Sequence, residues 1–291
     1  MKTPSFSIWS LGLILWLLII SCVDHEEPNP DRLRVAKLTR VLPDAPTDSI
    51  VSLFLYNQIG KVGSLLTSVK WGAPGSPSEQ SEYQYDGQGR LSQMKRTLST
   101  GGSELYLYTY DGWGKLTFIK YTGGGNDFYD FVLTYDGSGQ LLSTRRSFSI
   151  SGIKYEQANA LTFGMDNVSS VSSVTKLERN ITTTSTVTTD FGYDNHTNPF
   201  YGLFLIPAPE KIPMPSSGNF NLYTYYGGVN NLLHLSKNNL SSANVKGASQ
   251  TLYEYTYNAS GLPTIRKTWV KFTLEQPPVL KETLIYEYET Y

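Results

Sequence analysis

The sequence contains very little cysteine and histidine. Its 291 residues include one cysteine, Cys22, and three histidines. A single thiol cannot form an internal disulfide framework, and the chain lacks the thiols and paired histidines of a structural zinc site. We therefore expect no metal and no cofactor. The 24 Lys and Arg residues balance 25 Asp and Glu residues, which excludes the basic face typical of nucleic-acid binding.

Sequence signals of catalysis are also scarce. The chain has no Gly-x-Ser-x-Gly nucleophile elbow. A glycosidase needs two carboxylates, and Asp127 with Asp130, or Glu254 with an unidentified partner, would satisfy that requirement no better than many other acidic pairs. We therefore predict a non-catalytic protein. The alternative is a surface glycan hydrolase that uses an unidentified carboxylate pair.

An apolar run at the N-terminus, Ile8 to Ile20, follows Lys2 and precedes Cys22. About thirteen residues suffice for the core of a signal peptide but are too few to span a bilayer as a helix. The Ser21-Cys22 pair resembles the lipobox of bacterial lipoproteins, in which the thiol is acylated and cleavage leaves cysteine first. This resemblance implies a signal peptide over residues 1–21 and a membrane anchor on Cys22. The alternatives are an ordinary secretory signal with a chance cysteine and an N-terminal membrane anchor.

The segment after the cysteine combines acidic residues with prolines. Residues 23–27, Val-Asp-His-Glu-Glu, resemble the export signal that sends Bacteroidetes lipoproteins to the outer face of the outer membrane. A solvated linker is the alternative for this cluster. We expect residues 22–47 to form a proline-containing tether, in which residues 33–41 could form an edge strand protected by lysines and arginines.

A short motif of tyrosine, aspartate or asparagine, and glycine recurs along the chain. The form Tyr-Asp-x-x-Gly occurs three times at a spacing of 25 residues, and asparagine versions precede and follow it. Asp or Asn can accept a hydrogen bond from the backbone two residues on, and glycine readily adopts a positive φ. The motif therefore predicts structural hairpin turns, not calcium sites. Its residues are Tyr56, Asn57, Gly60, Tyr85, Asp86, Gly89, Tyr110, Asp111, Gly114, Tyr135, Asp136, Gly139, Tyr257, Asn258 and Gly261.

The residues between the turns alternate as strands do. Residues 104–110 place three tyrosines on one face and Leu, Leu and Thr on the other, the period-two pattern of a half-buried strand. Each unit of about 25 residues would then supply two strands. We predict an all-β antiparallel hairpin meander forming one domain over residues 48–291, with a proline-rich insertion at 200–218. Because a flat sheet of this width is unusual, the meander should be curled or barrel-like.

The motif followed by Arg or Lys and then Leu resembles the YD repeats of the Rhs family. With the lipobox, the whole chain resembles a Bacteroidetes surface-lipoprotein family of unknown function that carries such repeats, over about residues 50–291. Residues 194–200 and 236–239 also resemble later segments of that family. True YD repeats have a shorter period and run far longer, so toxin delivery is not implied. The resemblance implies a lipid-anchored surface protein, facing the cell exterior, that acts by binding or as structure.

Aromatic residues suggest where such a protein could bind. We expect most rings to form a ladder buried within the curled sheet, although exposed rings would suit a glycan. Trp113 lies at a predicted turn tip, so it is our candidate ligand-binding residue for a glycan or a surface protein. Ser49, in Asp48-Ser49-Ile50, resembles the O-glycosylation motif of exported Bacteroidetes proteins, with a chance match as the alternative.

Overall fold

The computed structural model describes residues 33–57, 65–76, 78–123, 128–150, 152–201, 235–273 and 275–290, and their regular structure is β-strand throughout. None of these residues forms a helix long and apolar enough to cross a bilayer. The strands are β1 Leu33–Leu42, β2 Ala45–Tyr56, β3 Leu66–Gly72, β4 Glu79–Tyr85, β5 Leu91–Thr97, β6 Ser103–Tyr110, β7 Leu116–Thr122, β8 Phe128–Tyr135, β9 Leu141–Ile150, β10 Ile153–Gly164, β11 Asn167–Glu178, β12 Thr182–Thr197, β13 Asn238–Val245, β14 Gln250–Tyr257, β15 Pro263–Lys271 and β16 Val279–Thr290.

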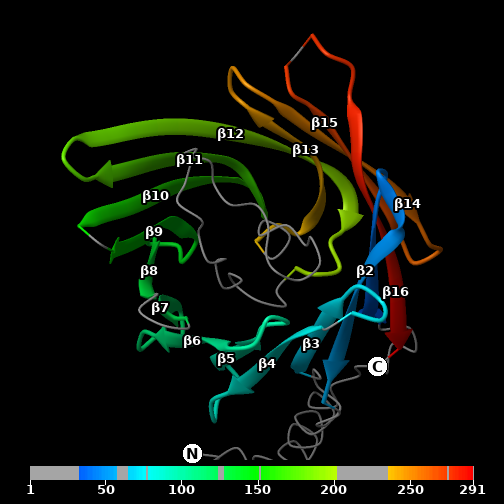
Figure 1. Cartoon of the computed structure of the whole chain (residues 1–291), viewed down its shortest axis with the longest axis horizontal. Helices are drawn as coiled ribbons and strands as arrows, with labels where there is room; N and C mark the ends of the chain where they lie inside the picture. The colour runs from blue at the N-terminus through cyan, green and yellow to red at the C-terminus, as the bar shows by residue number, and fades with distance from the viewer. Residues whose placement is uncertain are drawn as a thin grey trace, which may run out of the picture. The chain divides into compact units, whose positions relative to one another are not determined.

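The strands form a closed antiparallel barrel in which each lies beside its neighbours in sequence and β1 lies beside β16. Figure 1 shows this closure, where the blue first strands meet the red last strand. The prediction of an all-β antiparallel meander with a barrel-like form is therefore confirmed. Residues 34–289 make up one compact unit.

Closure corrects two expectations about the N-terminal part of the domain. Residues 33–41 do form a strand, β1, but it is not an edge, because β2 and β16 flank it on either side. Its basic side chains instead face carboxylates of β16: Arg34 pairs with Glu289 and Lys37 with Glu287. The expected domain start at residue 48 falls inside β2, so the barrel domain begins earlier, with β1.

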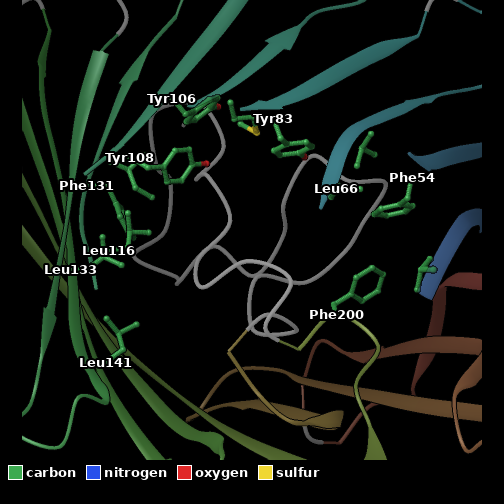
Figure 2. Close-up of a cluster of buried hydrophobic side chains, with 14 of the residues drawn as sticks. Phe54, Leu66, Tyr83, Tyr106, Tyr108, Leu116, Phe131, Leu133, Leu141 and Phe200 are labelled. Carbon is green, nitrogen blue, oxygen red and sulfur yellow. The ribbon is translucent and has the colours of Figure 1, made fainter. Parts of the chain in front are cut away.

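Side chains alternate between the inner and outer walls of the barrel. On β6, Glu104, Tyr106 and Tyr108 are buried while Leu107 and Thr109 are exposed. Figure 2 shows the buried side chains gathered on the inner side of the barrel. The expectation of a buried aromatic ladder holds only in part, because the tyrosines of the repeat motif are half-buried. The fully buried tyrosines of the described residues are Tyr83, Tyr106, Tyr108, Tyr121, Tyr155, Tyr253 and Tyr286.

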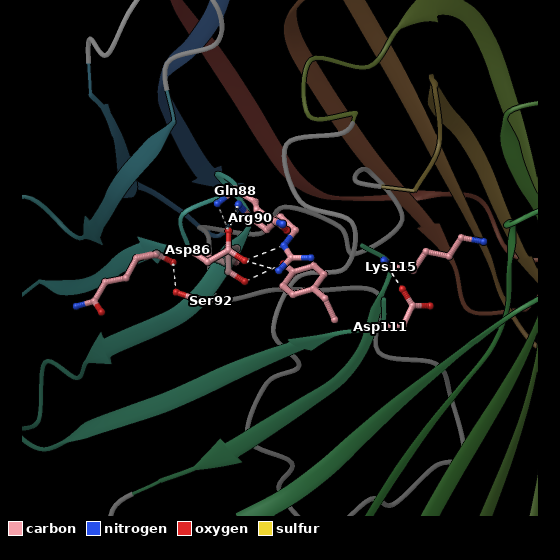
Figure 3. A network of polar contacts seen from close by, with 9 residues as sticks. Asp86, Gln88, Arg90, Ser92, Asp111 and Lys115 are labelled. Carbon is pink, nitrogen blue, oxygen red and sulfur yellow. Dashed lines mark hydrogen bonds and ion pairs between the residues drawn. The ribbon is translucent and has the colours of Figure 1, made fainter. Parts of the chain in front are cut away.

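The repeat turns are fixed by the aspartate or asparagine side chain. Asp86 Oδ1 accepts hydrogen bonds from the backbone N–H groups of Gln88 and Arg90, both at 2.9 Å, and Figure 3 shows this arrangement. The Arg90 backbone N–H, the Arg90 guanidinium and the Gln88 N–H together lower the pKa of Asp86. The same pair of backbone bonds recurs at Asp111, Asp136 and Asn258.

In four of the five motif copies the tyrosine joins its hairpin to the preceding strand, whereas the Tyr257 hydroxyl donates to the Asp194 carboxylate on β12. The ladder between β5 and β6 ends at the pair Gln93 and Leu107, and beyond it the Tyr110 hydroxyl donates to the Leu91 carbonyl at 2.7 Å. A buried hydroxyl needs a hydrogen-bond partner. This bond supplies one for the Tyr110 hydroxyl and also extends the contact between the two strands. Equivalent bonds to a neighbouring strand's carbonyl are made by Tyr56, Tyr85, Tyr135, Tyr193, Tyr255 and Tyr288.

Glycine at the fifth motif position adopts the left-handed region in each described repeat turn, with φ values of 75° at Gly89, 80° at Gly114, 89° at Gly139 and 74° at Gly261. Replacing Gly114 with alanine should lower the free energy of unfolding by about 1–2 kcal/mol, because an L-residue is strained there. Only the Arg90 Nη1 atom, at 3.8 Å, lies near the added methyl group, so the backbone dominates the effect.

Gly112, two residues earlier in the same turn, is the matched control for this prediction. It has no positive φ and open space around it, so Gly112→Ala should leave stability unchanged or raise it slightly. Urea unfolding of both variants measures the difference. Equal midpoints would contradict the assigned role of Gly114.

Candidate functional site

The outer wall of the barrel carries charged side chains in the middle of its strands. Several of them face an opposite charge directly across the strand pair, an arrangement worth about 0.2–1 kcal/mol per pair. Apolar side chains such as Leu55 and Leu107 also point outward. The cross-strand charge pairs are Glu82 with Lys95, Lys120 with Asp130, Glu156 with Lys176, and Glu254 with Lys267.

The inner wall contains a layer of buried charges near the end of the barrel opposite the repeat turns. Arg96 pairs with Glu79 at 2.5 Å and with Glu104 at 3.3 Å. The hydroxyls of Tyr106 and Tyr121 donate to the same Glu104 carboxylate at 3.2 and 2.9 Å. These contacts give the Glu104 carboxylate, which is almost fully removed from water, the hydrogen-bond donors that a buried charge requires.

A second buried charge cluster joins β15, β16 and β1. Arg266 and Glu282, each about 1–2% exposed, form an ion pair at 2.7 Å. Arg40 donates a hydrogen bond to the other carboxylate oxygen of Glu282 at 2.8 Å. The Thr268 hydroxyl donates to the same oxygen as Arg266, at 3.2 Å. Both buried clusters are internally paired, so they serve to hold strands together and present no free reactive group.

The outer wall also contains a shallow polar basin of about 310 Å³ over β8 to β11. Strand register assembles it, because Lys154 lies opposite Ser149 on one side and Glu178 on the other. The basin lies near the same end of the barrel as the buried charge clusters. Its lining residues are Asp130, Ser147, Ser149, Lys154, Tyr155, Glu156, Lys176 and Glu178.

The basin suits hydrogen bonding to a polar ligand better than acid catalysis. Lys176 and Glu178 form a direct ion pair; this bond raises the pKa of the lysine and lowers that of the glutamate. A glycosidase general acid needs a raised carboxyl pKa, which is the opposite direction. The lysines can donate to hydroxyl or carbonyl oxygens, and the carboxylates can accept from hydroxyls.

The tryptophans are not brought together into one shelf. Trp113 is 89% exposed at the tip of the β6–β7 turn, whereas Trp71 packs against the interior core. The Trp269 ring N–H donates to Glu254 on β14 at 2.9 Å, so this candidate carboxylate is already engaged. Trp113 is therefore the one tryptophan of the described residues that stands free in solvent.

Other predicted residues are placed as follows. Ser49 lies within β2 with its side chain partly buried, and the Asn57 side chain accepts a hydrogen bond from the Leu65 N–H at 3.2 Å. Phe200, at the start of the predicted insertion, is buried in the core. The signal peptide, Cys22, Gly60, Asp127 and residues 202–218 lie outside the described residues.

Among the described residues, no group of three or more His, Cys, Asp or Glu side chains is arranged to hold a metal ion. The buried charge clusters and the tyrosine hydroxyl bonds were not anticipated from the sequence. The sequence of β16 did contain a sign that Glu282 is buried, because the alternation places it on the same face as Leu284 and Tyr286.

Comparison with known proteins identifies the class of fold. A porin-like protein from Bacteroides uniformis, known from its crystal structure, is similar with a TM-score of 0.53 and 14% sequence identity, over 90% of this chain and 100% of that chain. At this identity the likeness concerns the fold alone, an antiparallel β-barrel. A complex described as TcdB2-TccC3-Cdc42 aligns at 13% identity over 76% of this chain and 12% of that chain, with a TM-score of 0.32. No family model and no curated protein matches the sequence.

Proposed function

We propose that this chain is a lipid-anchored outer-membrane protein whose barrel stands in water and acts by binding or as structure. The observation that supports this most is the polarity of the two walls. A transmembrane barrel turns an apolar band toward lipid and often a polar interior toward water, and a Lys or Arg at mid-bilayer costs about 2–4 kcal/mol. Here charged pairs such as Glu82 and Lys95, near the middle of β4 and β5, lie on the outer wall, while the inner wall is rich in aromatic residues.

The lipobox-like sequence supplies the attachment in this proposal. Acylation of Cys22 after removal of residues 1–21 would hold the protein at the membrane, because two or more acyl chains together bind far more stably than one. The acidic residues 23–27 support the outer face of the outer membrane as its location. The repeats, which resemble YD repeats, supply the hairpins of the barrel.

A glycan or a surface protein is the ligand class we propose. The basin over β8 to β11 offers alternating donors and acceptors without a large excess of either charge, which suits a polyhydroxylated ligand. The ion pair with Lys176 lowers the pKa of Glu178, so this carboxylate would not serve as the general acid of the hydrolase alternative. A glycan array screened with the mature protein would separate glycan ligands from protein partners.

Substitution of Cys22 by alanine tests the anchor and the water-facing outer wall together. With an ordinary cleavable secretory signal in place of residues 1–21, the variant should leave the membrane fraction on a carbonate wash, whereas the wild type should remain, because no acyl chain then holds the variant. His25→Ala, which leaves the cysteine intact, is the control and should stay bound. Retention of Cys22→Ala after the wash would contradict the proposal and point to a barrel embedded in lipid.

A further inference from the structure

We propose that the end of the barrel with the repeat turns faces the bilayer and places Trp113 and Met165 among the lipid headgroups. This inference rests on the proposed acyl anchor at Cys22. The turn end is defined by the β4–β5, β6–β7, β8–β9 and β10–β11 connections, and the far end by the β1–β2, β9–β10, β11–β12 and β15–β16 connections. Consecutive antiparallel strands alternate between these two ends.

The chain enters the barrel at the turn end. β1 begins at Leu33 and runs toward the β1–β2 connection at the far end, so its first residue lies level with the repeat turns. Eleven Cα–Cα steps lead from Cys22 to Leu33, with ten residues between them. They would cover roughly 17–20 Å as a flexible chain and at most about 40 Å when fully extended.

This short connection favours one end of the barrel over the other. A strand of eight residues, such as β6, is about 26 Å long. To bring the far end to the bilayer, the connection would have to run along most of the outer wall in a nearly extended form. The turn end needs no such path, so it is the end that the anchor holds near the membrane.

Two exposed side chains at the turn end fit a bilayer surface. Trp113 is 89% exposed and Met165, at the β10–β11 turn, is 94% exposed. Tryptophan is enriched at the membrane–water interface, where its ring is apolar and its N–H can still meet water. The Asp111 side chain fixes the Trp113 backbone at 2.9 Å, so the ring is presented on a rigid turn.

The Met165 side chain is presented on a tight turn. Met165 is the one non-glycine among the described residues with a positive φ, at 56°. The two-residue β10–β11 hairpin, in which Gly164 pairs with Asn167, imposes this conformation. The next residue, Asp166, is held by Lys237 through both a backbone bond of 3.1 Å and an ion pair of 3.2 Å.

Exposure alone does not choose between the two ends. The far end also exposes Ile181, at 79%, and Phe272, at 55%; the entry point of the chain is what distinguishes them. The orientation has a consequence for ligand binding: the polar basin, which lies near the far end, would face away from the membrane. Trp113 would then contact lipid and leave ligand recognition to the basin.

Depth-dependent quenching tests the orientation in the full mature, acylated protein. The protein is reconstituted into phosphatidylcholine vesicles with and without brominated acyl chains, and tryptophan emission is compared for wild type and Trp113→Phe. Brominated lipid should quench the emission that Trp113→Phe removes and should leave the emission of Trp71 and Trp269 unchanged. The matched control is Ile181→Trp in the Trp113→Phe background, whose indole at the far end should not be quenched.

The possible outcomes separate this inference from the anchor itself. If the protein floats with the vesicles and Trp113 is quenched selectively, the orientation is supported. If it floats but Trp113 is unquenched, or the indole at position 181 is quenched as strongly, the orientation is wrong while the anchor stands. Failure of the acylated protein to float overturns both proposals.

Discussion

Replacing Glu282 with glutamine should lower the free energy of unfolding by about 3–5 kcal/mol, the usual result of removing one partner of a buried ion pair. Glutamine keeps the shape of the side chain but removes its negative charge. Arg266, which is 1% exposed, would lose the carboxylate bond of 2.7 Å, and the bond of 2.8 Å from Arg40 would weaken. The change should appear as a large shift of the urea unfolding midpoint.

Glu287 on the same strand provides the control. It forms an ion pair with Lys37 at 2.7 Å, but both side chains are substantially exposed, so Glu287→Gln should cost no more than about 1 kcal/mol. Replacing Arg266 and Glu282 together with apolar residues should recover much of the loss, because the fully buried charge of Arg266 is then removed with its partner and the partly exposed Arg40 can turn to water. Similar small effects for Glu282→Gln and Glu287→Gln would show that the buried pair does not stabilise the barrel.

Local patterns in the sequence predicted the strands and turns well, because their causes are local. The bonds of Asp86 reach only two and four residues along the chain, and the alternation in residues 104–110 follows directly from strand geometry. The closure of the barrel depends instead on β1 meeting β16, whose residues lie more than 200 positions apart. No local pattern records that contact, so residues 33–41 were expected at an edge.

The buried charges were missed for a different reason. Alternation places Glu282 on the same face as Leu284 and Tyr286, but charged residues are almost never fully buried unless paired. The pairing that makes this burial tolerable comes from Arg266 on β15 and Arg40 on β1, the two strands that flank β16. This pairing can be recognised only when the register between neighbouring strands is known, and the sequence of a single strand does not give that register.

The candidate sites also differ in whether the local sequence could predict them. Trp113 could be singled out because its place in a repeated turn already implied exposure; the ligand role predicted for it from the sequence is replaced here by the proposed contact with lipid. The basin could not, because its side chains come from four strands and meet only through the pairing of Lys154 with Ser149 and Glu178. The tyrosine hydroxyl bonds also cross between strands, as from Tyr110 to Leu91, so the motif alone did not reveal them.

A second large effect is expected at Tyr106, where truncation to alanine should lower the free energy of unfolding by about 3–5 kcal/mol. The ring is fully buried and lies 4.9 Å from that of Tyr121. Its hydroxyl also donates to Glu104 at 3.2 Å. Alanine would leave a large void and remove one of the bonds that support a buried carboxylate.

The neighbouring residue turns this substitution into a test of which wall faces water. Leu107 follows on the same strand but points outward and is 39% exposed, so Leu107→Ala should change stability by less than about 1 kcal/mol. Urea unfolding of both substitutions in the Cys22→Ala background measures the difference. If Leu107→Ala proved as damaging as Tyr106→Ala, the outer wall would be packed against something other than water. The proposed function depends on a water-facing outer wall. That result would therefore contradict the proposal and favour a barrel embedded in the lipid bilayer.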